Sequence, residues 1–117
     1  MERVLFIECG WGSDQHGQDV TKAAVRACRR AIEFNSLPSM RDLVPGGYGA
    51  MRLCVKIGVP NPGQVDMDKV ADVFPYGQLE IEVVEGGLSY PSGIVLPEMG
   101  DSSDEAVIAV ASVAVGY

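Results

Sequence analysis

The chain has 117 residues, of which 47% are hydrophobic and 21% are charged, and its formal net charge is −7. This composition excludes a disordered chain, and the negative charge argues against a nucleic-acid backbone or an anionic membrane surface as partner. The length predicts one domain over residues 1–117. Because the apolar share is high for so small a chain, we expect a homo-oligomer in which some apolar surface faces another subunit.

The cysteine pattern and the hydropathy indicate in which cellular compartment the protein lies. The three cysteines Cys9, Cys28 and Cys54 lie in apolar strand or helix patterns, which indicates buried thiols rather than disulfides. No signal-like segment opens the sequence, and the longest apolar run, 106–115, is too short to cross a bilayer. These features predict a cytoplasmic protein.

The first two elements follow from the change in hydrophobic period. A continuous apolar run over 3–9 predicts a strand covered on both faces, ended by Gly10 and Gly12. Apolar residues at helical spacing predict a helix over about 19–35, with Gln18 or Asp19 as its N-cap. The other elements are expected as a helical turn at 40–44, strands at 52–59, 78–85 and 106–115, a short helix at 65–74 and a short extended piece at 94–96.

The resulting order, β-α-β-α-β-β, predicts an α/β (α+β) domain with right-handed crossovers and a mixed sheet that carries its helices on one face. The other face then needs cover, which predicts subunits that pack sheet against sheet. This order resembles the fold of the trimeric chorismate mutase of the bacillus type. The resemblance implies a trimer or a multiple of one, with sites between subunits, but a shared fold carries no function by itself.

The segment "GWGSDQHG", residues 10–17, falls at the junction between the first strand and the first helix. It resembles the G-x-G-x-D-x-H-G signature of a small family of uncharacterised proteins found in bacteria and, with an N-terminal extension, in plants. The resemblance runs over essentially the whole chain. It identifies a family but implies no particular chemistry.

The same spacing is similar to the metal site of methylerythritol cyclodiphosphate synthase, in which the aspartate and the histidine bind zinc. That partial resemblance implies that Asp14 and His16 are ligands of a divalent metal such as zinc. His16 is the only histidine, and catalytic zinc usually takes three protein ligands. A third ligand would therefore come from Glu8, Cys9, Asp19 or a neighbouring subunit.

A metal-free site at the junction is an open alternative. Glycines allow a tight turn, and free N–H groups at a helix start bind anions, while His16 acts as acid or base oriented by Asp14. The segment expected to hold a small, anionic ligand comprises Gly10, Trp11, Gly12, Ser13 and Gly17. In a third interpretation, Asp14 only caps the turn and His16 packs against the loop.

A second pair of candidates is Lys56, in the middle of the predicted strand 52–59, and Ser92, in the loop before the last strand. A lysine desolvated by another subunit has a lowered pKa, which suits a base or nucleophile. The segments "VKIGVP" and "PSGI" faintly resemble the lysine and serine segments of the ring-opening amidohydrolases, in which three repeated domains surround a central site. That resemblance implies a metal-free Lys–Ser enzyme.

Two loops complete the sequence-based expectations. The Gly-rich stretch 44–51 is expected to be a mobile lid over the site, and Asp101, Asp104 and Glu105 are expected to be solvated. The sequence thus predicts a small-molecule enzyme or binding protein with a metal or anion site at the strand-to-helix junction. A Lys–Ser amidohydrolase and a non-catalytic ligand-binding or assembly protein remain as alternatives.

Overall fold

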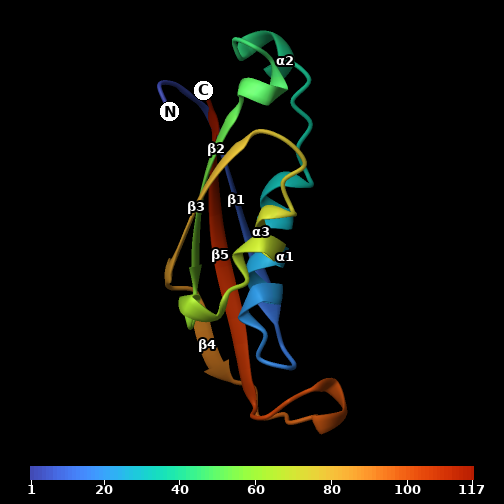
Figure 1. Cartoon of the computed structure of the whole chain (residues 1–117). Coiled ribbons are helices and arrows are strands. Elements are labelled where there is room, and N and C mark those ends of the chain that lie inside the picture. The colour runs from blue at the N-terminus through green and yellow to red at the C-terminus, as the bar shows by residue number, and fades with distance from the viewer.

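A five-stranded mixed sheet forms the body of the structure, a computed structural model that describes all residues from 1 to 117 (Figure 1). The strands are β1 (Val4–Asp14), β2 (Arg52–Val59), β3 (Gln78–Glu85), β4 (Leu88–Pro91) and β5 (Glu105–Gly116). The helices are α1 (Val20–Ile32), α2 (Met40–Leu43) and α3 (Met67–Ala71), and single 3-10 turns lie at Tyr48–Ala50, Pro62–Gln64 and Pro97–Met99. The molecule is elongated, with extents of 50 × 23 × 19 Å.

Strand β5 is the centre of the sheet, whose order is β1-β5-β2-β3. It runs antiparallel to β1 and β2 and, nearer its start, to β4, while β2 and β3 are parallel. Helices α1 and α3 cover one face of this sheet (Figure 1). The prediction of a mixed sheet with its helices on one face is therefore confirmed.

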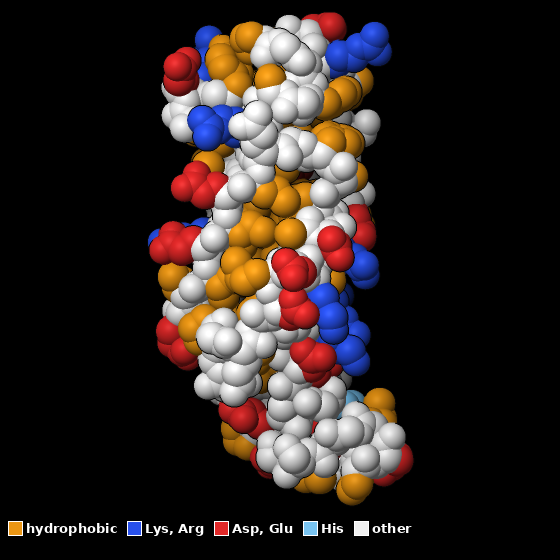
Figure 2. All heavy atoms as spheres, in the orientation of Figure 1, with side chains coloured by type: hydrophobic (Ala, Val, Ile, Leu, Met, Phe, Trp, Pro, Cys, Tyr) orange, Lys and Arg blue, Asp and Glu red, His pale blue; other side chains and the backbone are white.

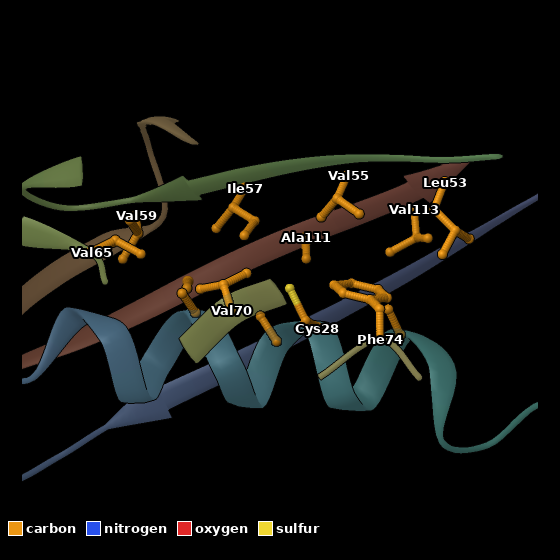
Figure 3. Packing of buried hydrophobic residues seen from close by; sticks show 14 of the residues in the cluster. Cys28, Leu53, Val55, Ile57, Val59, Val65, Val70, Phe74, Ala111 and Val113 are labelled. Carbon is orange, nitrogen blue, oxygen red and sulfur yellow. The ribbon is translucent and has the colours of Figure 1, made fainter. Parts of the chain in front are cut away.

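The core lies between α1, α3 and the sheet. Asp19 caps α1 by accepting a hydrogen bond from the Lys22 N–H, which confirms the predicted start of this helix. Figure 3 shows Cys28 of α1 pointing toward the side chains of α3 and of the sheet. The buried cluster is built largely of small residues on α1 and of β-branched residues on the strands, among them Ala23, Ala27, Val55, Ile57 and Val113.

The first strand is longer than predicted, because Gly10 and Gly12 lie inside β1 rather than ending it. Both glycines face α1. A Cβ on Gly10 would lie 2.4 Å from the Ala27 carbonyl oxygen, and one on Gly12 would lie 2.4 Å from the Ala27 backbone nitrogen. Their function in the fold is therefore close packing of β1 against an alanine-rich helix face.

Other expectations near the end of the chain need correction. Residues 94–96, predicted as extended, lie in a loop, and the short strand is β4, which precedes them. The predicted helix at 65–74 is confined to α3. The strands predicted at 52–59 and 78–85 coincide with β2 and β3, and β5 exceeds its predicted range by one residue at each end.

The second face of the sheet carries no helix and exposes apolar side chains. Trp11 pairs with Val110 across β1 and β5, and these side chains are 55% and 47% exposed. Ile7 on the same side of β1 is also exposed. Cys9 lies between them and is exposed, so the prediction that all three cysteines are buried is wrong for Cys9 and holds for Cys28, while Cys54 is half-buried.

Candidate functional site

The motif segment 10–17 is fixed to the loop before β5 by one carboxylate, that of Asp101. Its Oδ1 accepts hydrogen bonds from the Gly17 N–H (2.7 Å) and from Gln18 Nε2 (3.0 Å). Its Oδ2 accepts one from the Leu96 N–H (2.9 Å) and lies 2.7 Å from His16 Nδ1. The Asp101 side chain is fully buried, so the expectation that it is solvated is wrong.

Asp101 is consequently a strongly stabilised anion. The hydrogen bonds from the Leu96 N–H and from His16 hold the pKa of its carboxyl well below its usual range, and those from Gly17 and Gln18 add to the effect. Buried carboxylates are stable only when their lone pairs are satisfied in this way.

His16 is oriented by this carboxylate. The contact at 2.7 Å engages Nδ1 of the imidazole, and 23% of the His16 side chain remains accessible to solvent. No other atom of the chain forms a hydrogen bond to Nε2, so this nitrogen is available to a ligand. A histidine whose Nδ1 is held by a buried aspartate has the arrangement of a general acid–base pair. Figure 2 shows the histidine at the lower end of the molecule.

Asp14, the predicted partner of His16, has other contacts. Its Oδ2 accepts a hydrogen bond from the Asp19 N–H at 2.8 Å, and its Oδ1 lies 3.5 Å from Arg26 Nη1. The side chain is buried, and it ties the end of β1 to the start of α1. Asp14 therefore stabilises the junction between β1 and α1. The carboxylate that orients His16 is that of Asp101, and not that of Asp14 as predicted.

The donor set does not fit zinc within one chain. The structure contains no group of three or more histidine, cysteine, aspartate or glutamate side chains that converge as metal ligands. Asp14 and His16 are each bound to a different partner, and of the proposed third ligands Glu8 accepts a hydrogen bond from Asn35 while Asp19 caps α1.

The predicted anion site at the same junction is occupied by the chain's own carboxylates. The Asp14 carboxylate accepts a hydrogen bond from the Asp19 N–H, and the Asp19 carboxylate accepts one from the Lys22 N–H. The Asp101 carboxylate accepts one from the Gly17 N–H. Gly10 and Gly12 face α1 and leave no space for a ligand. Of the residues expected to bind the ligand, only Gly17 adjoins the His16–Asp101 pair directly.

Trp11 and Ser13 lie on the edge strand β1, where their carbonyl groups accept hydrogen bonds from arginines of α1. Arg26 Nη1 donates to the Ser13 carbonyl at 2.6 Å, and Arg30 Nη1 donates to the Trp11 carbonyl at 3.2 Å. The Arg30 guanidinium also lies 4.8 Å from the centre of the Trp11 ring. Since β1 pairs only with β5, these arginines satisfy carbonyls at a free strand edge and make pairing with another chain there less favourable.

Lys56 and Ser92 do not meet within one chain. Lys56 is opposite Ser112 of β5 and its Nζ lies 3.7 Å from Glu82 Oε2, both side chains being mostly exposed. Ser92 bonds to the Asp104 carbonyl at the other end of β5. Eight residues of strand separate these points, which is about 26 Å. Ser92 Oγ also accepts the Ile94 N–H, which is typical of a serine in a turn.

The Gly-rich loop 44–51 is not a lid over His16. Val44 and Met51 of this loop are buried, and the loop lies with α2 at the end of the molecule opposite to residues 92–104 (Figure 1). Asp101 was missed because 85 residues separate it from His16, and nothing in the spacing of the motif predicts which distant loop packs against it.

Comparisons with known proteins agree with this fold and assign no activity. The model of a family described as "Conserved hypothetical protein (Lin0512_fam)" matches residues 4–115. A crystal structure of an FtsZ-like protein of unknown function from Nostoc punctiforme PCC 73102 is similar with a TM-score of 0.89 and 39% identity, over 97% of this chain and 93% of that chain. The comparison with curated proteins found no match. None of the helices is long and apolar enough to span a membrane.

Proposed function

This chain belongs to the Lin0512 family of conserved hypothetical proteins, and we propose that its His16 and Asp101 form an acid–base pair that acts on a small molecule at the junction of β1 and α1. The observation that carries the proposal is the 2.7 Å contact between His16 Nδ1 and a fully buried carboxylate, beside a partly exposed imidazole. Three free cysteines also support a reducing, cytoplasmic location.

The chemistry follows from the two nitrogens of the imidazole. The Asp101 carboxylate accepts a hydrogen bond from Nδ1–H, so the lone pair of the neutral ring lies on Nε2. Nε2 then accepts a proton from a bound hydroxyl, water or amine, and the adjacent negative charge stabilises the imidazolium that forms. The surrounding N–H donors keep Asp101 ionised throughout, because they stabilise its anion and not its acid.

A reactive acyl ester, p-nitrophenyl acetate, is a suitable probe because His16 is the only histidine and no second imidazole contributes to the rate. We expect the wild type to hydrolyse it faster than His16→Ala. We expect Asp101→Asn to lose most of this difference, since the asparagine amide donates to Nδ1 and moves the proton to Nε2. Equal rates for the wild type and His16→Ala would overturn the proposal.

Self-assembly is a second candidate, and the exposed apolar face of the sheet favours it. We propose that a second copy of this chain covers Ile7, Trp11 and Val110, which are 63%, 55% and 47% exposed. The same face carries Lys56 beside Glu82, so it offers both signs of charge to an identical partner. A partner of uniformly basic charge would fit this mixed surface less well.

The oligomeric state tests this second candidate. Sedimentation of the wild type is expected to give a trimer or a multiple of one, and the double variant Ile7→Lys with Val110→Lys is expected to give monomers. The matched control is Met67→Lys, which changes an apolar side chain that is 41% exposed and lies in α3, on the helix-covered side of the sheet. A monomeric wild type, or a double variant that stays associated, would contradict assembly through this face.

A further inference from the structure

A cavity of about 630 Å³ lies at the other end of β1, away from His16. It is bounded by the end of α1, the loop that contains α2, and the segment between α3 and β3. On β1, six residues separate its member Glu8 from Asp14, which is about 20 Å of strand. The volume lies in the range of small-molecule sites, and none of the residues predicted to be catalytic lines it.

From this cavity we infer a second binding site, one that takes an organic ammonium ion carried on an aromatic or other apolar body. Apolar side chains supply 11 of its 19 lining residues, which suits the body of such a ligand. The polar side chains of the lining determine which charge the ligand carries.

The polar lining selects a cation. The charged groups of the lining are the carboxylates of Glu8, Glu33 and Asp72 and a single guanidinium, that of Arg29. Arg29 already lies 4.0 Å from Glu33. Neither Glu8 nor Asp72 forms an ion pair with any lysine or arginine of the chain. Two carboxylates without a cation therefore face one cavity, and a bound anion would meet repulsion from both.

Glu8 is the best-positioned of these groups. It is half-buried on the helix-covered side of β1, and its Oε1 accepts a hydrogen bond from Asn35 Nδ2, which also donates to the Ala31 carbonyl. Asn35 thus fixes one oxygen of Glu8 and leaves the other free. Burial raises the pKa of this carboxyl although the Asn35 hydrogen bond opposes the change. A bound ammonium would offset that loss of hydration.

Two tyrosines supply an aromatic wall for the same ligand. The rings of Tyr48 and Tyr76 have centroids 5.0 Å apart with an angle of 50° between their planes. Tyr48 lies in the loop 44–51 and Tyr76 lies just before β3, so the pair joins two segments across the cavity. Ammonium groups bind favourably over tyrosine faces, and an apolar body gains from contact with them.

The test compares tryptamine with indole-3-acetate, which share a ring and differ in charge, by calorimetry and by NMR of the Asn35 amide. Tryptamine is expected to bind saturably and about tenfold more tightly than indole-3-acetate. Glu8→Gln keeps the acceptor for Asn35 and is expected to weaken tryptamine binding about tenfold. Asp72→Asn, a second variant on the surface of the cavity, is expected to weaken it less because Asp72 is exposed.

Two controls separate this site from the acid–base pair. Glu85→Gln removes an equally negative but distant, exposed carboxylate and is expected to leave binding unchanged. His16→Ala is likewise expected to bind tryptamine as the wild type does, so a failed ester assay leaves this site standing. Absence of tryptamine binding at millimolar concentration, tighter binding of indole-3-acetate, or full affinity in Glu8→Gln would each overturn the inference.

Discussion

Substituting Gly12 by alanine tests whether the motif glycines serve packing or ligand binding. The new Cβ would lie 2.4 Å from the Ala27 nitrogen, 2.5 Å from Arg26 Cβ and 2.6 Å from the Ala23 carbonyl oxygen. Ordinary contacts begin at 3.4 Å, so α1 must move away from β1 by about 1 Å where it faces Gly12. Because backbone atoms of the helix block the methyl group, no change of rotamer relieves the clash.

Overpacking of this kind costs about 1–3 kcal/mol, and we expect Gly12→Ala near the upper limit, with a melting temperature lowered by on the order of 10 °C. Urea unfolding followed by circular dichroism measures the free energy. Gly63→Ala is the control, since no atom lies within 4 Å of its Cβ, and its effect is expected within about 0.5 kcal/mol. Equal stability of the two variants would refute the packing argument.

Four further predictions concern ionisable groups and metal. The folded-state pKa of Asp101 is depressed, so its stabilisation is present above its ordinary pKa of 3.8 and is lost as the pH falls below that value; acid titration of unfolding should be less steep for Asp101→Asn. The folded-state pKa of Glu8 is raised above 4.5, so ionisation there lowers stability as pH rises, and Glu8→Gln should unfold at higher urea concentration at pH 7 but not at pH 3. Burial raises the pKa of the Cys28 thiol to about 12, so a thiol reagent at pH 8 should label Cys9 quickly and Cys28 only after denaturation. Reconstitution with zinc should give equal metal content in the wild type and His16→Ala, and one zinc per chain lost in the variant would contradict the donor geometry.

The sequence predicted most of the fold because hydrophobic period is a local property. Strands β2 and β3 alternate between a covered and an open face, and their limits follow from that alternation. The start of α1 is local too, since Asp19 caps it through the Lys22 N–H. Gly10 and Gly12 misled the prediction of β1, because glycine is typical both of a turn and of close contact with a helix.

The site was predicted only in part, because its geometry depends on contacts between distant segments. The motif correctly directed attention to His16, which lies at the predicted junction. Its partner Asp101 is 85 residues away in a loop, and only the folding of β5 beside β1 brings the two together. The cavity near Tyr48 was also missed, because the Gly-rich stretch 44–51 that borders it was predicted to be a lid over the motif site instead.

In the proposed acid–base pair, Asp101 holds the proton of His16 on Nδ1 and leaves the Nε2 lone pair free. Nitrogen-15 NMR of the single imidazole at a pH where the ring is neutral measures this directly. We expect the Nδ1–H form in the wild type and a shift toward the Nε2–H form in Asp101→Asn, with both proteins folded. The same mixture of the two forms in both proteins would contradict it.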